Sequence, residues 1–312
     1  MARIVGMPGP TAGSAVPVGR ARTLAQVYRH FGEVDAAGTS PLYERVAVAL
    51  SESNAALHDL ALAGRAPALA AAYAAADGDA AAGAAIDTLL RMTDSVVAIA
   101  VRRQTRTNET GRCAVLYPAI AEAARRVGAN AVGLIDVGCS AGLNLNVDRV
   151  GITYSNGQSL GDPSSPVQLS SSIVGDRPIP ARAMPEVVAR VGVDLDPVDV
   201  TDADDARWLR ACLWPDQPER AARLEAEMAL AATAPPLLLQ GDAVEVVPDG
   251  RAVAWVSAEG VGVAPAIPTL GDRRASGHSI IGLAVFDRSA LRAEAIGRCW
   301  SQGRLLAWLA DS

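Results

Sequence analysis

The segment Leu134-Ile-Asp136-Val-Gly138-Cys-Ser140-Ala-Gly142-Leu143 decides the expected fold. An apolar run ends here in an acidic residue and a glycine turn, which is typical of a buried parallel strand leading into a helix. Glycines let a ligand approach the backbone closely, and a helix N-terminus offers free N–H groups to a carboxylate or phosphate. We therefore interpret Asp136, Gly138, Ser140 and Gly142 as a binding turn. The alternative is an ordinary strand–turn–helix that binds no ligand.

The same turn resembles the first motif of the methyltransferases that depend on S-adenosylmethionine (SAM), an acidic residue followed by alternating glycines. Ser140 stands where that motif has its middle glycine. The GxGxxG fingerprint of dinucleotide-binding domains is not present. The resemblance implies a Rossmann-like α/β sheet of the class I methyltransferase type, with SAM bound at the turn.

Two more acidic residues lie where this resemblance implies contacts with SAM. Asp194 ends the apolar segment that contains Gly192 and would bind the ribose hydroxyls, because carboxylate oxygens can accept from a vicinal diol. Asp242 follows the predicted strand at 237–240 and would lie near the adenine. Both residues can also be read as plain polar strand ends.

The elements around the turn divide the chain into three parts. Residues 1–20 are rich in Gly and Pro and are expected to form a flexible arm, and residues 21–103 an alanine-rich helical domain. Residues 104–312 are expected to form the α/β domain, with a hairpin-like insertion at 151–185. Because strands and helices alternate there, the sequence predicts a parallel or mixed α/β sheet.

Within the α/β domain, hydrophobic periodicity and turn residues predict the individual elements. We expect helices at 113–127 and, broken at Pro215, at 202–232. We also expect a helix end followed by a strand within 187–194, and a helix with a terminal strand within 289–308. Further strands are expected at 131–137, 237–240, 251–257 and 280–286.

A polar segment, Thr105-Arg106-Thr-Asn108-Glu109-Thr-Gly-Arg112, directly precedes this domain. Arginine is a natural receptor for carboxylate, phosphate or sulfate, and a carboxylate held between arginines stays ionised and can act as a base. We therefore predict catalytic roles for Arg106, Asn108, Glu109 and Arg112. The alternative is a solvated loop with local salt bridges.

Two other residues complete the predicted catalytic set. Tyr154 and Asp162 belong to the insertion, and Asp162 lies in the sequence Gly-Asp-Pro-Ser-Ser-Pro, which we interpret as a rigid loop over the strand ends. An ordinary surface loop is the other reading.

Composition excludes several classes of function. The net charge of −6 argues against a nucleic-acid binder, which needs a basic surface. All 28 basic residues are arginine, so lysine Schiff-base and P-loop chemistry are excluded. The scattered cysteines and histidines predict no metal site, and we expect reduced thiols in a cytoplasmic protein without a membrane-spanning helix or secretory signal.

Longer stretches resemble a bacterial family known as domain of unknown function 2332. They include SPLYERVAVAL, TNETGRCAVLYP, DVGCSAGLNLNVDR, GDPSSPV and GVDLDPVDVTDADDARWLRACLWPDQPER, within about residues 25–260. The resemblance implies a methyltransferase-like fold, whereas activity in this family is largely unassigned.

The chain departs from that family after Asp242. Too few residues separate Asp242 from the strand around Trp255 for the strand, helix and strand that a methyltransferase fold has there. We therefore expect an incomplete sheet. Its bare edge or apolar face would be covered by a second protein subunit in a heteromer, since natural proteins rarely leave such surfaces exposed.

These features lead to a hypothesis about function. The chain would be a secondary-metabolite enzyme, of the antibiotic-biosynthesis kind, that needs no cofactor. It would close a small ring such as an aziridine when an amine of the substrate displaces sulfate, a reaction that needs positioning, a base and cations. One alternative is a genuine SAM-dependent methyltransferase of small molecules. Another is a non-catalytic subunit that stabilises an active partner.

Overall fold

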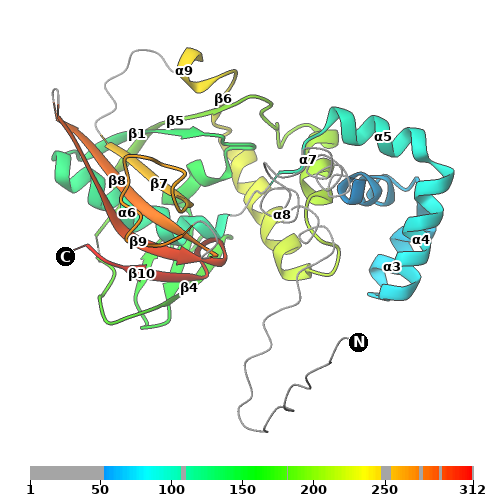
Figure 1. Cartoon of the computed structure of the whole chain (residues 1–312), viewed down its shortest axis with the longest axis horizontal. Coiled ribbons are helices and arrows are strands. Elements are labelled where there is room, and N and C mark those ends of the chain that lie inside the picture. The colour runs from blue at the N-terminus through cyan, green and yellow to red at the C-terminus, as the bar shows by residue number, and fades with distance from the viewer. Residues whose placement is uncertain are drawn as a thin grey trace, which may run out of the picture.

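The structure is a computed structural model that describes residues 53–106, 110–180, 182–246, 254–273, 277–287 and 290–310. The predicted arm at residues 1–20 and the start of the predicted helical domain lie outside these residues. The described part is a mixed α/β fold with two sheets, one parallel and three-stranded, the other mixed and seven-stranded (Figure 1).

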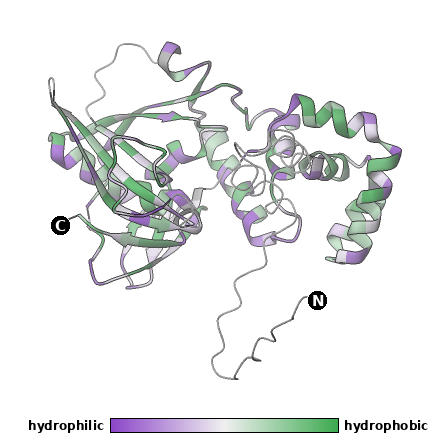
Figure 2. Cartoon of the chain, in the orientation of Figure 1, coloured by the Kyte–Doolittle hydropathy of each residue, from purple (hydrophilic) through white to green (hydrophobic). Residues whose placement is uncertain are grey.

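The N-terminal described part is helical. A helix at 53–62 is followed by α3 (Pro67–Ala74), α4 (Gly78–Arg91) and α5 (Thr93–Arg102). The Asp77 side chain caps α4 by accepting a hydrogen bond from the Ala80 amide. Hydrophobic residues make up much of these helices (Figure 2), and those that face inward pack with Trp208 into one core.

The three-stranded sheet consists of β1 (Ala131–Val137), β5 (Glu186–Asp194) and β6 (Leu237–Gln240). All its pairings are parallel, with β5 in the middle. The predicted strands at 131–137 and 237–240 are confirmed. The predicted helix end near Val187 is wrong, because β5 already begins at Glu186, in register with Ala131 of β1.

Helices connect these strands. Helix α6 (Cys113–Val127) is confirmed and ends at Gly128, whose φ of 68° lies in the left-handed region that glycine favours. The predicted helix at 202–232 is also confirmed with its break, as α7 (Ala203–Ala211) and α8 (Pro218–Thr233). The turn after β1 leads into η3 (Leu143–Arg149), a 3-10 helix, and the short α9 (Ala243–Val246) follows β6.

The second sheet has the strand order β3-β2-β4-β10-β9-β8-β7. Its members are β2 (Gly151–Tyr154), β3 (Ser159–Gly161), β4 (Gln168–Ile173), β7 (Ala254–Gly260), β8 (His278–Asp287), β9 (Ala290–Trp300) and β10 (Leu305–Trp308). Strands β2 and β3 form the expected hairpin of the insertion. Strand β7 and strand β8 correspond to the strands predicted at 251–257 and 280–286.

The helix expected within 289–308 is wrong, because these residues form β9 and β10. Alanine, glutamate and arginine in Ala290–Trp300 favour a helix locally. The segment instead pairs with β8 on both sides of a bulge at Ile296, and the Ile296 side chain is fully buried in the main core. Tertiary pairing therefore overrides the local preference. The terminal strand expected in this segment is confirmed as β10.

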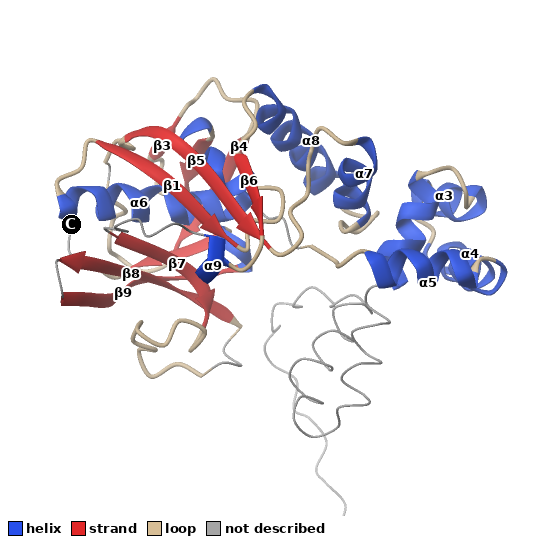
Figure 3. Ribbon diagram, turned by 90° about the horizontal axis from the view of Figure 1, so that it is seen from above, coloured by secondary structure: helices blue, strands red, loops and turns tan. Residues whose placement is uncertain are grey.

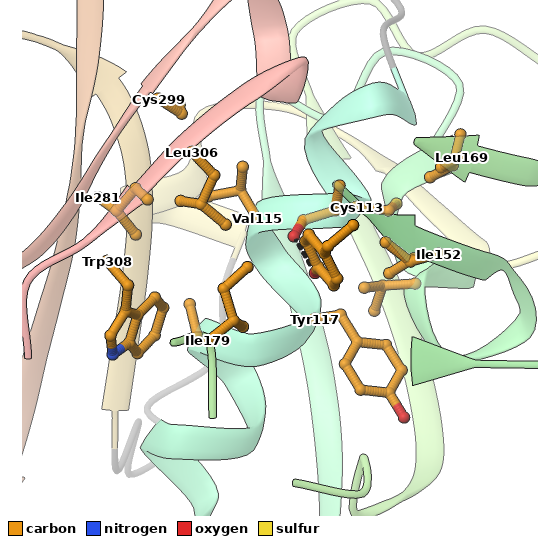
Figure 4. Packing of buried hydrophobic residues seen from close by; sticks show 14 of the residues in the cluster. Cys113, Val115, Tyr117, Ile152, Leu169, Ile179, Ile281, Cys299, Leu306 and Trp308 are labelled. Carbon is orange, nitrogen blue, oxygen red and sulfur yellow. Dashed lines mark hydrogen bonds between the residues drawn. The ribbon is translucent and has the colours of Figure 1, made fainter. Parts of the chain in front are cut away.

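Helix α6 lies between the two sheets, as the view from above shows (Figure 3). The main core surrounds it, with Ile281, Leu306 and Trp308 of the seven-stranded sheet on one side and Ile152 and Leu169 on another (Figure 4). Leu134 of β1 and Val256 of β7 both pack against this core. Among the described residues, no helix is both long and apolar enough to span a bilayer.

Candidate functional site

The turn after β1 is built from three left-handed residues. Gly138, Ser140 and Gly142 have φ angles of 72°, 51° and 65°. A Cβ on Gly142 would meet Pro236, Leu145 and Leu238 at 3.1–3.2 Å, whereas one on Gly138 would meet nothing within 4 Å. The turn is therefore held by backbone conformation at Gly138 and by both conformation and close packing at Gly142.

The amides of this turn donate to the protein itself. The N–H groups of Gly138 and Cys139 donate to the Val193 carbonyl, at 2.8 and 3.3 Å. The Ser140 amide donates to Asp194 Oδ2 at 2.8 Å, and the Gly142 amide donates to the Cys139 carbonyl at 2.8 Å. These hydrogen bonds thus attach the turn to the end of β5.

Asp194 is the centre of an ion-pair network in which both of its carboxylate oxygens accept hydrogen bonds. Besides the Ser140 amide on Oδ2, its Oδ1 accepts from Arg106 Nη1 at 3.1 Å and from the Asp196 amide at 3.0 Å. Arg106 also donates through Nη2 to the backbone carbonyl and to Oδ2 of Asp196. The Arg106 and Asp194 side chains are 13% and 7% exposed. Removing one partner of such a buried pair is costly, because the other charge is then left buried and unpaired.

Asp136, by contrast, is a half-buried residue with one oxygen that lacks a hydrogen bond in the described part of the chain. Its Oδ2 is shielded from solvent and has no hydrogen-bond partner among the residues that the structure describes. Burial raises the pKa of Asp136 to about 6; Arg112 opposes this shift, and the negative charges of Asp194 and Glu259 add to it. The carboxyl therefore exchanges its proton near neutral pH, as a general base or acid requires.

Arg112 connects Asp136 to the other sheet. Its Nη1 lies 3.9 Å from Oε1 of Glu259 on β7, and its positive charge also acts on Asp136 and Cys299. The Arg112 and Glu259 side chains are 32% and 50% exposed. We call Asp136, Arg112 and Glu259 the carboxylate cluster. In this cluster the Asp136 Oδ2 atom is shielded from solvent, whereas the Arg112 and Glu259 side chains are partly exposed.

The neighbouring thiols are poor nucleophiles. Burial raises the pKa of Cys299 to about 11 and that of Cys113 well above its ordinary value. Both therefore stay protonated at neutral pH, and only the thiolate is a good nucleophile.

A family model covers residues 52–250, more than half of the chain, and describes uncharacterized proteins conserved in bacteria, domain of unknown function 2332 (DUF2332). The chain belongs to the DUF2332 family. No curated protein and no solved structure matches it. Membership confirms the resemblance seen in the sequence, and the matched residues include the glycine turn, Arg112 and Asp194, but not Glu259.

In the DUF2332 chain, these residues hydrogen-bond mainly to one another. Asp194 already accepts three hydrogen bonds, from Arg106, Ser140 and Asp196, of the roughly four that a carboxylate can accept, which leaves about one for a ribose diol. The turn amides that would face the cofactor donate to Val193, Asp194 and Cys139 instead. As arranged, the turn therefore offers the ribose of SAM fewer free hydrogen-bonding groups than the resemblance implies.

The other predicted site residues are dispersed. Tyr154 is buried in the main core, where its hydroxyl donates to the Ala114 carbonyl at 2.6 Å and burial raises its pKa. Asp162 is exposed, and its Oδ1 accepts from the amide and hydroxyl of Ser164, which lowers its pKa. Asp242 is exposed beyond β6. Asn108 and Glu109 lie outside the described residues.

Glu259 is the member of the carboxylate cluster that sequence reasoning missed. A signal was present, because Ser257-Ala-Glu259-Gly is an acidic residue near the end of an apolar run, as Asp136 is. Its proximity depends on how β7 joins the second sheet, which the sequence did not indicate. Among the described residues, no group of three or more metal-ligating side chains is found.

Proposed function

We propose that this DUF2332 protein is a small-molecule biosynthetic enzyme that works without SAM, with Asp136 as its general base and Arg112 as its anion receptor. The observation that carries the proposal is the buried Asp136 Oδ2, which lacks a partner in the described part of the chain. A carboxyl with a pKa of about 6 beside a partly exposed guanidinium is a combination that proton transfer uses.

The reaction that we propose is an intramolecular displacement. The substrate's amine attacks a carbon that bears sulfate, so an N–C bond forms while the C–O bond breaks and its electron pair leaves with sulfate. The amine proton passes to Asp136, and Arg112 stabilises the departing anion. Because all 28 basic residues are arginine, the nucleophilic amine belongs to the substrate. The product is a small ring such as an aziridine.

This proposal replaces Glu109 with Asp136 as the base. It keeps Arg112 from the predicted set, and it gives Arg106 a positioning role, because Arg106 is engaged by Asp194 and Asp196. Arg112 pairs more loosely, at 3.9 Å from Glu259, and can exchange that partner for a substrate anion.

The test uses a simple probe, 2-aminoethyl hydrogen sulfate, together with its phosphate analogue and its three-carbon homologue. We expect the chain to accelerate sulfate release, measured by ion chromatography, with ring formation seen by NMR and no effect of added SAM. Tight calorimetric binding of S-adenosylhomocysteine, accompanied by methylation of an acceptor, would overturn the proposal in favour of a methyltransferase.

The proposal also includes a second subunit. Ile135, Val137 and Leu237 are 54%, 62% and 58% exposed, and the strand register places them on one face of the three-stranded sheet. Exposed apolar side chains grouped on one face of a sheet are a feature of interaction sites. We expect a partner protein to cover this face, opposite the side of β1 that carries Asp136.

The same apolar face favours a second candidate function, that of a non-catalytic subunit. An Ile135→Asp variant distinguishes the two, because it should weaken partner binding in sedimentation velocity while leaving the carboxylate cluster unchanged. If Asp136→Asn leaves the reaction of the complex intact and Ile135→Asp abolishes it, the chain is a structural subunit. A wild-type chain that stays monomeric and binds no hydrophobic dye would remove the reason to expect a partner.

A further inference from the structure

A cleft lies where the helix at 53–62 and α3 meet the connection between α7 and α8. It has a volume of about 340 Å³, and His58, Leu62, Tyr73, Leu213 and Trp214 are among its lining residues. Small-molecule sites typically measure roughly 300–1,000 Å³ and are lined mainly by apolar and aromatic side chains with a few polar groups. The cleft meets this description, and none of its lining residues belongs to the carboxylate cluster.

His58 supplies the directional group of the cleft. Its Nδ1 lies 3.0 Å from the Leu213 carbonyl and 3.2 Å from the Ala211 carbonyl, so Nδ1 carries the proton and donates. Burial lowers the pKa of His58, although the two carbonyls and Asp59 act in the opposite direction. Because the pKa is lowered, the ring is neutral at pH 7. Nε2 is therefore a fixed hydrogen-bond acceptor, and no described residue donates to it.

The remaining lining indicates the shape and charge of a ligand. The rings of His58 and Tyr73 meet edge to face at a centroid distance of 5.4 Å, and Trp214 adds a third ring. Arg210 and Glu225 also line the cleft, but they neutralise each other through two hydrogen bonds of 2.5 and 2.8 Å. The lining thus favours an uncharged aromatic molecule.

We propose that this cleft binds an uncharged bicyclic aromatic molecule whose single N–H or O–H donates a hydrogen bond to His58 Nε2. A cavity of about 150 Å³ accepts benzene, so this cleft has room for a second fused ring. The aromatic lining stacks with the ring system, and His58 selects molecules with a donor. The site is independent of the proposed ring-closing reaction.

The test compares three bicyclic aromatic probes by calorimetry on the full chain. Indole carries an N–H donor, whereas 1-methylindole and benzothiophene do not. We expect saturable binding of indole, about five-fold tighter than that of 1-methylindole, which is the effect of one hydrogen bond. Binding of these probes does not depend on the catalysed reaction. A negative result here would therefore not affect the proposed function, and failure of the proposed function would not affect this proposal.

Two variants assign the binding to the cleft. His58→Asn keeps a donor near the position of Nδ1 and removes Nε2, so we expect it to lower the affinity for indole about five-fold and leave that for benzothiophene unchanged. Ala70→Leu fills the cleft, which Ala70 lines, and should weaken all three probes at least ten-fold. The proposal is overturned if no probe binds saturably, if Ala70→Leu binds like the wild type, or if the wild type shows no preference for indole over 1-methylindole.

Discussion

The segment before α6 carries two arginines, and each acts on an acidic residue at the end of β1 or β5. The two arginine–carboxylate arrangements differ. Arg106 and Asp194 form a buried pair in which both carboxylate oxygens have donors. Asp136 keeps an unpartnered oxygen in the described part of the chain, while Arg112 reaches toward Glu259 at 3.9 Å. A carboxylate whose two oxygens both have donors serves structure, whereas one with a free oxygen retains capacity for chemistry.

The largest expected effect is on activity, and it concerns the carboxylate with the unpartnered oxygen, Asp136. We expect Asp136→Asn to lower the rate of sulfate release from the active probe by roughly 10²–10⁴-fold, the usual contribution of a general base. Folding should not suffer, since an amide replaces a buried carboxyl without adding charge. The matched control is Asp176→Asn, at an exposed position outside the site. Equal rates for Asp136→Asn and the control would show that Asp136 is not the base.

The next effect separates the two arginines by stability. Arg106→Leu leaves Asp194 charged and buried, which should lower the free energy of unfolding by about 3 kcal/mol. Arg112→Leu serves as the matched control and should cost less than about 1 kcal/mol, because its partner Glu259 is half-exposed. Urea denaturation measures both. Similar losses in the two variants would mean that the pairs are energetically alike.

The sequence predicts most of the elements that carry these residues, but not which arginine pairs with which carboxylate. The end of β1, α6 and the acidic residue of β5 were predicted because hydrophobic runs and turn residues are local signals. Which guanidinium meets which carboxylate depends on tertiary geometry, so Arg106 was predicted to be catalytic although Asp194 engages it. The β9 pairing and the approach of Glu259 are likewise non-local, and Tyr154 was predicted as a site residue because sequence carries no sign of its burial.

A smaller effect concerns pH. Because the folded-state pKa of Asp136 is raised from 3.8 to about 6, the protonated carboxyl stabilises the fold below pH 3.8, and this contribution is lost as pH rises through about 6. The loss is at most about 3 kcal/mol. The stability of Asp136→Asn relative to wild type should therefore increase between pH 5 and pH 7 in urea titrations.

The reaction rate should also depend on the ionisation of Asp136, but it should rise with pH where the stability falls. A base must be deprotonated, so the rate should rise with pH around a midpoint near 6. Arg112 lowers the pKa of Asp136 and Glu259 raises it. Removing each charge, in Arg112→Leu and Glu259→Gln, should therefore move the midpoint up and down respectively. Midpoints that stay at the wild-type value in both variants would assign the titration to another group.

The smallest expected effect tests whether the glycine turn serves mainly to stabilise the fold. Gly138 and Gly142 both have left-handed φ, so alanine at either should cost roughly 1–2 kcal/mol of stability. Only at Gly142 would the new Cβ also crowd Pro236, Leu145 and Leu238, so Gly142→Ala should lose more than Gly138→Ala in urea denaturation. A turn built chiefly to let a ligand approach would behave differently, since Gly138→Ala would then weaken ligand binding while Gly142→Ala would not. Equal stability losses at the two positions would mean that packing around Gly142 yields to a methyl group and that the turn is held by its backbone hydrogen bonds to β5 alone.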